Sequence, residues 1–310
     1  MLPDVSVVVA NYAGESVLHR CLESIRVQSH PPREVLVIDA GPGNNAAPLV
    51  ANSDVRVLRR ANRGLGHLYN EGARAASGEL LFLANNDVEL APRCIELLAR
   101  ELIRRPEGFA TDPRQVGADG STLVHGRASL RRGPFLRQPL PGFRLDLRAP
   151  AEAPVDTVSA NGAAMLVRRD RLLALDGFDE TMFLDFEDID LCWRAWCRGW
   201  TSVHVPEATV RHHVGVATHE SGALRRRLRS SHHNLVRFAA KCFPPADVAR
   251  VVAGELVRLP RHPSLVGPAL ASVALELPEI LAARRAVRPS AELMSWMLAG
   301  QPSRSHGSQS

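Results

Sequence analysis

The first ninety or so residues of this 310-residue chain alternate between short apolar strands and helical patterns, and this alternation restricts the fold more than any other feature. Residues 5–10 (VSVVVA) are rich in β-branched side chains and show no polar alternation, as is typical of a parallel strand covered on both faces. Further strands are predicted at residues 35–39, 55–58 and 80–84, with helical segments between them. The pattern predicts an α/β protein with a doubly wound, Rossmann-like, mostly parallel sheet flanked by helices.

Polar side chains stand where three of these strands end. Asn11, Asp39 and Asp87 each follow or close an apolar strand pattern. In doubly wound sheets, ligands bind beyond the carboxyl ends of the strands. We therefore expect these three side chains, which are distant in the sequence, to converge on one crevice.

The composition indicates a globular protein of a reducing compartment. Hydrophobic residues make up 45% of the chain and charged residues 23%, a balance that supports a sizeable core. Five cysteines without a CxxC pair argue against a disulfide framework. Met1 leads directly into a strand pattern without signal-peptide features. We expect a cytoplasmic protein.

The charge and the hydropathy pattern bear on its partners. No apolar stretch reaches the roughly 20 residues that span a bilayer, because the nearest candidate, residues 264–283, is interrupted by prolines and glutamates. The formal net charge of +5 fits an anionic partner. This charge alone does not choose between a nucleotide, a lipid phosphate and a nucleic acid.

The second half of the chain has a less regular pattern. Residues 108–154 are rich in Arg, Pro and Gly and are predicted to form a long, partly ordered excursion. Regular structure is expected again at residues 158–167, 186–198 and 203–212, and from Ala223 onward the chain is helical and arginine-rich. We therefore predict one α/β domain at residues 1–220, a helical, basic and amphipathic extension at 221–300, and a disordered tail at 301–310.

Asp87 is the first candidate for chemistry. A carboxylate on a tight turn after a buried strand can bind a divalent cation, and Mg²⁺ is usually held by one or two carboxylates together with substrate phosphates. The alternative, which this short element alone favours, is an Asx turn in which Asp87 caps a helix that starts near Pro92.

The segment from Gly177 to Gly199 is the richest in acidic residues. Asp185 is predicted to cap the helix at residues 186–198, and Gly199 to end it. Stabilisation of the helix dipole would explain one or two of the carboxylates, but this segment holds six: Asp179, Glu180, Asp185, Glu187, Asp188 and Asp190. A carboxylate held rigidly at a helix N-terminus can act as a general base, and Asp188 is the predicted one.

Two further features are weaker. His212 and His213 end the strand at residues 203–212, and a neutral imidazole there could complete a metal site with Asp87, although a lone histidine at a strand end is more often structural. The basic run at residues 225–229, with Arg237 and Lys241 beyond it, is most simply a solvated helix face. Its apolar side, which includes Leu224 and Leu228, makes contact with anionic lipid a second interpretation.

Taken together, six segments occur in the order of a known family. They are VSVVVANY followed by CLESIRVQS, VLVIDAG, NEGARAASGELLFLANND, ANGAAMLVRRD, GFDETMFLDFEDIDLCWRAWCRG and VPEATVRHHVG. Over about residues 4–245 the chain resembles the family 2 glycosyltransferases of the GT-A fold, in particular the rhamnosyltransferase-like branch that builds bacterial surface polysaccharides.

The resemblance implies an inverting, metal-dependent glycosyltransferase that acts by single displacement. The donor would be a nucleotide-diphosphate sugar of the dTDP-rhamnose or UDP-sugar type, and the acceptor a glycan or a lipid-linked saccharide. A divalent cation, Mg²⁺ or Mn²⁺, would assist. A peripheral place on the inner face of the plasma membrane is expected, and no nucleic acid is expected to bind.

The resemblance also implies a role for each matching residue. Those at the donor would be Asn11, Tyr12, Asp39, Arg63, Asn86 and Asp87. Asp87 would be the last residue of the metal-binding DxD-type motif and, with His212 or alternatively His213, would bind the metal. Gly162 and Ala163 would lie where sugar and acceptor meet. Asp188 would be the base, and Glu187 would contact the acceptor.

Two departures and two rival functions accompany this prediction. The usual Gly-Ser-x-Asp after the second strand is replaced by GPGNN at residues 41–45, and the DxD element keeps one carboxylate. A nucleotidyltransferase would also have a nucleotide-binding sheet and a metal aspartate, but residues 11–15 (NYAGE) form no phosphate loop. An inactive, membrane-associated scaffold is the other rival, and the presence of both Asp87 and Asp188 argues against it.

Overall fold

A computed structural model describes residues 1–42, 46, 54–133, 141, 143–214, 221–287 and 289–299. The predicted turn residues Asn44 and Asn45 and the predicted disordered tail at residues 301–310 lie outside this part of the chain.

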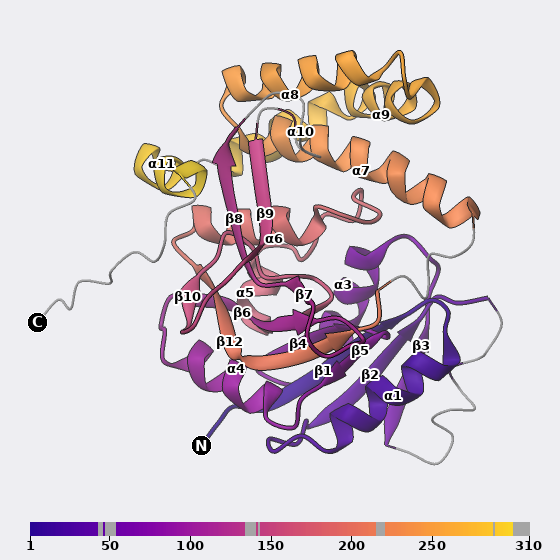
Figure 1. Ribbon diagram of the computed structural model, residues 1–310, viewed down its shortest axis with the longest axis vertical. Helices are drawn as coiled ribbons and strands as arrows, with labels where there is room; N and C mark the ends of the chain where they lie inside the picture. Colours follow the sequence, from indigo (N-terminus) through magenta and orange to yellow (C-terminus); the bar gives the residue numbers. More distant parts are fainter. Residues whose placement is uncertain are drawn as a thin grey trace, which may run out of the picture.

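A large mixed sheet forms the centre of the molecule (Figure 1). Its strand order is β10-β12-β6-β11-β4-β1-β2-β3, with β5 paired to β12 and β7 paired to β6. The strands of this sheet are β1 (Val5–Asn11), β2 (Glu34–Asp39), β3 (Val55–Arg59), β4 (Leu80–Asn85), β5 (Val88–Leu90), β6 (Gly108–Val116), β7 (Leu123–His125), β10 (Val155–Asp156), β11 (Ala164–Arg168) and β12 (Thr201–His212). A separate two-stranded sheet pairs β8 (Arg127–Arg132) with β9 (Phe143–Ala149).

The N-terminal half of the sheet has the predicted parallel arrangement. Strand β1 pairs in parallel with both β2 and β4, and β2 pairs in parallel with β3. The other half is mixed, because β11 runs antiparallel to β4 and β6 while β12 is parallel to β6. The predicted α/β class with a mostly parallel sheet is confirmed.

The prediction of an irregular excursion at residues 108–154 is wrong. This region contains β6, which lies between β11 and β12 in the sheet, together with β7, β8 and β9. Strand β6 carries two buried polar residues, Asp112 and Gln115, and these interrupt the apolar run that identifies a central strand. The loss of periodicity therefore reflected polar groups inside the sheet.

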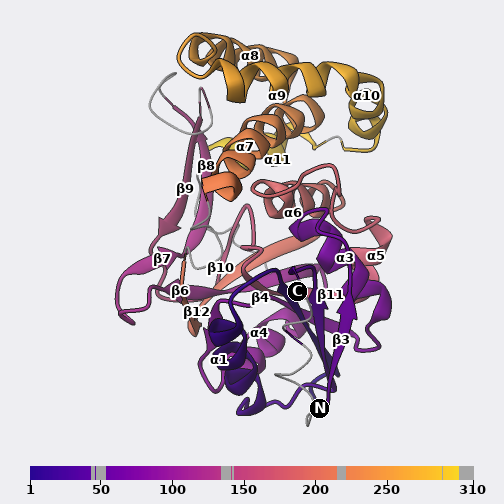
Figure 2. The same cartoon turned by 90° about the vertical axis from the view of Figure 1, so that its right-hand side faces the viewer.

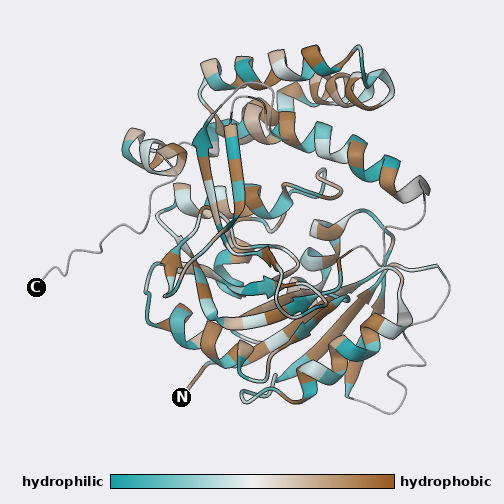
Figure 3. Cartoon of the chain, viewed as in Figure 1, coloured by the Kyte–Doolittle hydropathy of each residue, from teal (hydrophilic) through white to brown (hydrophobic). Residues whose placement is uncertain are grey.

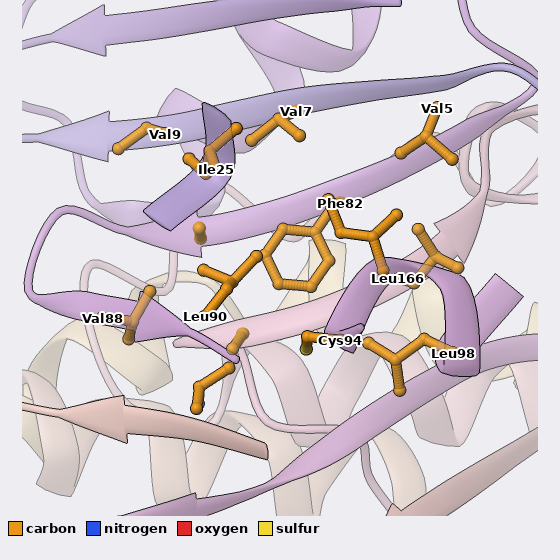
Figure 4. Packing of buried hydrophobic residues seen from close by; sticks show 14 of the residues in the cluster. Val5, Val7, Val9, Ile25, Phe82, Val88, Leu90, Cys94, Leu98 and Leu166 are labelled. Carbon is orange, nitrogen blue, oxygen red and sulfur yellow. The ribbon is translucent and has the colours of Figure 1, made fainter. Parts of the chain in front are cut away.

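Helices cover both faces of the sheet. Residues of α1 and α4 share one core cluster with β1, β4 and β12, and residues of α3 and α6 share another with the opposite faces of β1 and β4. Figure 4 shows the first cluster, in which Val5, Val7 and Val9 of β1 lie near Phe82 of β4. The helices of this part are α1 (Glu15–Arg26), α3 (Leu65–Ala75), α4 (Cys94–Ile103), α5 (Arg169–Ala174) and α6 (Glu187–Cys197).

The C-terminal helices stack at one end of the molecule, and the β8–β9 hairpin extends from the sheet toward them (Figures 1 and 2). They are α7 (Ser221–Cys242), α8 (Pro245–Arg258), α9 (Pro263–Leu275), α10 (Leu277–Ala286) and α11 (Ala291–Ala299). A third core cluster joins them to α6 and to the hairpin through side chains such as Trp193, Phe143 and Phe238. The predicted helical extension is confirmed, while its boundary at residue 220 stays a prediction.

The hydropathy of the elements follows this architecture. Strands β1 and β4 are mainly hydrophobic, whereas the C-terminal helices mix hydrophobic and hydrophilic residues along their length (Figure 3). Across the described residues, no single helix is long and apolar enough to cross a membrane, although α9 and α10, bent by 63°, meet the length and composition criteria as a pair.

Candidate functional site

The ends of β1 and β2 and the turn after β4 meet at the carboxyl edge of the sheet, as the sequence predicts. Asn11 donates a hydrogen bond from Nδ2 to Asp39 Oδ1 (2.8 Å), and Asn86 donates from Nδ2 to Asn11 Oδ1 (2.6 Å). All three side chains are buried. The structure therefore brings three of the predicted donor residues into one hydrogen-bonded network.

A pocket opens beside this network. Tyr12, which is partly exposed, lies on its wall. A side chain at Gly41 would place its Cβ 2.3 Å from the carbonyl oxygen of Tyr12, so only glycine fits there. The residues that line the pocket are Asn11, Tyr12, Ala13, Gly14, Leu18, Asp39, Gly41, Pro42 and Ala46.

Two arginines near this edge differ from the sequence prediction. Arg59, which the sequence did not single out, donates to Asp39 Oδ2 and to the carbonyl oxygen of Gly41 (2.8 Å). The pairing of Asp39 with Arg59 follows from the register of β2 and β3 and is invisible before the strand order is known. Arg63 lies outside the pocket lining and faces Glu180, with 3.7 Å between Nη2 and Oε2.

Asp87 and His212 form the second part of the site. His212 ends β12 opposite Val88, so its imidazole comes beside the Asp87 carboxylate, with 3.4 Å between Nε2 and Oδ1. Among the described residues, Asp87 Oδ1 is buried and has no hydrogen-bond partner. Asp87 also caps no helix, because β5 follows it directly and α4 begins only at Cys94. The helix-cap alternative is therefore wrong.

The protonation of the two imidazole nitrogens of His212 depends on the hydrogen bond that its Nδ1 makes with Gln115. His212 Nδ1 lies 3.0 Å from Gln115 Oε1, and an amide oxygen only accepts. Nδ1 therefore carries a hydrogen, and in the neutral imidazole the lone pair of Nε2 lies on the side of the Asp87 carboxylate. Two acceptors that face each other across a short gap form a suitable site for a cation.

His213 is arranged differently. Its backbone N–H donates to the carbonyl oxygen of Asp87 (2.9 Å), while its Nε2 lies 2.8 Å from Glu89 Oε1. Its side chain is thus engaged with Glu89. Within the described ranges, no group of three or more His, Cys, Asp or Glu residues is placed to hold a metal, so a cation at Asp87 and His212 needs ligands from a bound substrate or water.

Glu187 and Asp188 open helix α6. The predicted N-cap at Asp185 is wrong: Phe186 is the N-cap residue, with φ of 72°, and no side chain of the described chain caps this helix end. Asp185 also has a positive φ of 70°, and its carboxylate pairs with Arg227 of α7 (3.0 Å) instead. Two consecutive residues other than glycine in the left-handed region mark a strained turn directly before the two carboxylates.

Asp188 is held by backbone donors. The N–H of Gly162 donates to its Oδ2 (2.8 Å) and the N–H of Ile189 donates to its Oδ1 (2.8 Å). Asp188 is half-buried, and a carboxylate retains further lone pairs after accepting two such bonds. A Cβ at Gly162 would lie 3.4 Å from Asp188 Cβ, so this glycine packs directly against Asp188.

The two carboxyls have different electrostatic environments. Burial, and then the charge of Asp188, raise the pKa of Glu187 well above its usual range. Burial also raises the pKa of Asp188, but the N–H groups of Gly162 and Ile189 oppose the rise. Burial therefore favours the protonated form more strongly at Glu187 than at Asp188, whose charged form is stabilised by two backbone donors.

Tyr69 connects the two halves of the site. It is fully buried on α3, and its hydroxyl lies 2.7 Å from the carbonyl oxygen of Gly162 and 3.0 Å from Asn85 Oδ1. Asn85 precedes the Asp87 turn, and Gly162 contacts Asp188. Burial, and then the charges of Glu187 and Asp87, raise the pKa of Tyr69, so it remains a neutral donor. The sequence did not indicate this role, because a tyrosine within a helical pattern is typical of a core residue.

Part of the predicted solvated face of α7 is buried in ion pairs. Lys241, the chain's only lysine, lies 2.8 Å from Asp179 Oδ2 and 2.5 Å from Asp190 Oδ1 through Nζ. Arg237 pairs with Asp179 (3.1 Å) and with Glu276 (2.8 Å). The interpretation of Arg237 and Lys241 as solvated residues is wrong, because the acidic segment around α6 packs against them. The exposed arginines of the run are Arg225, Arg226 and Arg229.

Comparison with known proteins agrees with this geometry. The family model described as Glycosyltransferase like family 2 matches residues 3–232. A Mycobacterium tuberculosis N-acetylglucosaminyl-diphospho-decaprenol L-rhamnosyltransferase is 33% identical over 238 residues, which cover 68% of this chain and 76% of that protein. A pre-mycofactocin glycosyltransferase of the same organism is 29% identical over 67% of this chain and 42% of that protein.

Solved structures share the fold. The structure described as GalNAc-T7 with UDP, GalNAc and Mn²⁺ matches with a TM-score of 0.61 and 18% identity, over 79% of this chain and 49% of that one. A mannosyltransferase from Pyrobaculum calidifontis in complex with GDP-Man and Mn²⁺ matches with a TM-score of 0.56 and 17% identity, over 96% of this chain and 84% of that one. These are GT-A glycosyltransferases, and the predicted GT-A fold is confirmed.

Proposed function

The chain belongs to the family 2 glycosyltransferases and is a glycosyltransferase, and from this premise we propose that it transfers a sugar with inversion from a nucleotide-diphosphate donor to a glycan or lipid-linked saccharide, with Asp188 as the general base. The observation that carries the proposal is the distribution of two carboxylates around one polar network: Asp87 lies on the turn after β4, and Asp188 contacts Gly162. The Tyr69 hydroxyl lies within hydrogen-bond distance of both segments, 2.7 Å from the Gly162 carbonyl oxygen and 3.0 Å from Asn85 Oδ1.

Asp188 would accept the proton of the acceptor hydroxyl. As that oxygen forms a bond to the anomeric carbon, the bond to the diphosphate oxygen breaks, and the nucleoside diphosphate leaves with the electron pair. The backbone donors of Gly162 and Ile189 fix the carboxylate, and its raised pKa makes it a stronger base while it stays ionised. A single displacement of this kind inverts the anomeric centre.

Glu187 would assist from beside the base. Its Oε2 is buried without a partner among the described residues, and its raised pKa favours the protonated form, which can donate one hydrogen bond. The acceptor sugar is a group that could accept it. Gly162 and Ala163 would form the wall where sugar and acceptor meet, since Gly162 leaves the space next to both carboxyls open.

Asp87 and His212 would hold a divalent cation, Mg²⁺ or Mn²⁺, together with the donor diphosphate. The unpartnered Asp87 Oδ1 and the lone pair of His212 Nε2 fit such an ion. When bound, it would neutralise charge on the leaving diphosphate. Asn11, Tyr12 and Asp39 would contact the nucleotide base and the ribose at the pocket. Asn86 would support the turn that carries Asp87, next to the donor diphosphate. Arg63 remains a weaker donor candidate because its side chain faces Glu180.

The donor and acceptor classes are proposed by similarity. A relative that is 33% identical is an N-acetylglucosaminyl-diphospho-decaprenol L-rhamnosyltransferase, which supports a deoxysugar or hexose donor of the dTDP-rhamnose or UDP-sugar type and a lipid-linked saccharide acceptor. A role in building a bacterial cell-envelope polysaccharide fits this assignment.

A cytoplasmic place at an anionic membrane surface is proposed as well. The five cysteines are free, as in a reducing compartment. Exposed leucines on the C-terminal helices, among them Leu256, Leu275 and Leu281, accompany exposed arginines such as Arg261 and Arg285. Flotation with anionic vesicles at low salt tests this, and failure to co-migrate would contradict it.

Replacement of the base tests the catalytic assignment. Asp188→Asn keeps the size of the side chain, and we expect kcat for turnover of a dTDP- or UDP-sugar with Mg²⁺ or Mn²⁺ to fall by about 10²-fold or more. Asp176→Asn, an exposed residue with φ of 58°, is the matched control and should leave the rate unchanged. Equal turnover by wild type and Asp188→Asn would refute the base assignment. Pyrophosphate release from a nucleoside triphosphate would favour the nucleotidyltransferase instead.

A further inference from the structure

Gln115 occupies an unusual place for an uncharged polar side chain. It lies on β6, between β12 and β7, and is fully buried. Its Oε1 accepts from His212 Nδ1 (3.0 Å), and its Nε2 donates to Asn161 Oδ1 (3.0 Å). Both ends of the amide are therefore committed to side chains from different strands or loops of the site.

Asn161 links Gln115 to the backbone of residues 161–163. Its Oδ1 also accepts from the backbone N–H of Ala163 (3.0 Å). The intervening N–H of Gly162 donates to Asp188 Oδ2 (2.8 Å). The segment of residues 161–163 is thus held by Gln115 on one side and contacts the proposed base on the other.

We propose that Gln115 is a positioning residue: it fixes His212 as the Nδ1–H tautomer, with Nε2 directed at Asp87, and through Asn161 it ties this imidazole to the segment that supports Asp188. The inference rests on the proposed function for the meaning of the Asp87–His212 pair. It adds a residue that the family resemblance did not supply.

The chemistry of the amide explains why the residue at this position matters. A neutral imidazole can carry its proton on either nitrogen, and a metal can bind only the nitrogen without it. An acceptor at Nδ1 selects the tautomer that presents Nε2 as a ligand, and such supporting partners are typically worth 10- to 100-fold in metal affinity or activity. Leucine at position 115 would fill the same volume but provide no acceptor.

The experiment compares four proteins: wild type, Gln115→Leu, Gln115→Glu and Gln28→Leu. The first readout is the ¹⁵N chemical shifts of the His212 ring in metal-free protein, assigned by their loss in His212→Ala. The second is Mn²⁺ affinity, measured by electron paramagnetic resonance with UDP or dTDP, whichever the wild type binds more tightly.

We expect the wild type to have the Nδ1–H tautomer, and Gln115→Leu to lose it and to bind Mn²⁺ about 10- to 100-fold more weakly. Gln115→Glu retains an acceptor for Nδ1–H and should keep the tautomer, but it loses the donor to Asn161 Oδ1 and should bind Mn²⁺ about as weakly as Asn161→Ala. Gln28 is the matched control because it is also a buried glutamine, with its amide bonded to backbone groups of Ser24 in α1, Ala91 after β5 and Ile95 in α4. Gln28→Leu should leave both readouts unchanged.

The link to Asn161 is tested by a double-mutant cycle. Asn161→Ala should weaken Mn²⁺ binding in the wild-type background and add little to Gln115→Leu, because both changes break one connection. If the losses of Mn²⁺ affinity in the two single variants add up in the double variant, Gln115 does not act through Asn161. If Gln115→Leu misfolds by circular dichroism, Asn161→Ala and Gln115→Glu still decide the question.

The failures of the two proposals are distinguishable. If the wild type binds no Mn²⁺, the metal part of the proposed function fails and the tautomer measurement alone decides the role of Gln115. If the wild type binds Mn²⁺ and Gln115→Leu keeps both the Nδ1–H tautomer and the affinity within about threefold, well below the loss typical of such a partner, Gln115 has no positioning role.

Discussion

Asp87 has a side chain that the rest of the fold uses little. Its Oδ1 has no hydrogen-bond partner in the described part of the chain, and its side chain adds nothing to the apolar core. We expect Asp87→Ala to abolish metal-dependent binding of a nucleoside diphosphate while the unfolding midpoint changes little. Calorimetry with UDP or dTDP and Mn²⁺, with circular dichroism as the control for folding, measures both. Unchanged affinity would contradict the role of Asp87.

Glu187 gives a pH-dependent signature of the carboxyl pair. Burial raises its pKa in the folded state, whereas the unfolded chain titrates at about 4.3. Between these two values the folded state holds a proton that the unfolded chain has released, so the free energy of unfolding falls as the pH rises. A glutamine side chain at this position would resemble the protonated form. The advantage in stability of Glu187→Gln over wild type should therefore grow as the pH rises above about 4.3.

Urea denaturation at several pH values measures this difference, and Glu180→Gln provides a control of opposite sign. Burial would raise the pKa of Glu180, but hydrogen bonds from Asn70 and His67 lower it. Wild-type Glu180 therefore stabilises the fold above its ordinary pKa, and that contribution is lost as the pH falls. A pH-independent difference between Glu187→Gln and wild type would show that Glu187 is ionised in the folded protein.

The residues of the site were predictable to different degrees. Asn11 and Asp39 could be placed because strand ends in a parallel sheet share one edge, and the structure joins them to Asn86, the neighbour of Asp87. Arg59 and Gln115 could not, since their contacts depend on the order and register of strands that are distant in sequence.

At the scale of elements, helix α7 holds the strained turn before α6. Asn234 is fully buried, and its Nδ2 donates to the carbonyl oxygens of Leu184 (2.9 Å) and Asp185 (2.7 Å). Ser231 and Arg227 hold the Asp185 carboxylate. These contacts fix the positive φ angles of Asp185 and Phe186, and so the direction in which Asp188 enters the site.

Asn234→Ala tests this support. It removes the side-chain donor to the Asp185 carbonyl oxygen, while the Leu184 carbonyl oxygen keeps the Ser230 hydroxyl, and this should cost about 1–3 kcal/mol in the free energy of unfolding. We also expect a lower kcat with little change in KM for the donor, because the base moves while the nucleotide pocket does not. Arg229→Ala, at an exposed position of the same helix, is the control. A stability loss without any change in kcat would mean that the turn keeps its conformation unaided.

Elements were predicted best where their pattern is apolar. The first four strands and helix α6 agree with the sequence prediction to within a few residues. Strand β6 was missed because Asp112 and Gln115 are buried inside the sheet, and polar residues at such positions are typical of a loop. Buried polar groups near a site thus weaken the sequence signal of the strand that carries them.

At the scale of the whole molecule, the C-terminal helices and the transferase core are joined by a buried network of charges. Asp179 precedes α6, and its carboxylate contacts Lys241 (2.8 Å) and Arg237 (3.1 Å) of α7. Arg237 continues to Glu276 at the end of α9, and Lys241 to Asp190 of α6. The sequence predicted helices in both regions but could not predict that their charges would pair, because the contacts span tens of residues.

Asp179→Asn should therefore destabilise the whole molecule in a pH-dependent way. Burial would raise the pKa of Asp179, but Lys241 and Arg237 hold it well below its usual range. The stabilisation is fully present above the unfolded value of about 3.9 and is lost as the pH falls through the folded pKa. Breaking a buried pair of this kind costs about 3 kcal/mol, so at pH 7 Asp179→Asn should unfold at a clearly lower urea concentration. That difference should shrink below about pH 4 as Asp179 of the wild type itself becomes protonated.

Asp4→Asn, which removes an exposed pair with Arg33, should change the free energy of unfolding by less than about 1 kcal/mol. An Asp179→Asn protein as stable as wild type at pH 7 would show that the two parts of the molecule are held together by the apolar cluster alone.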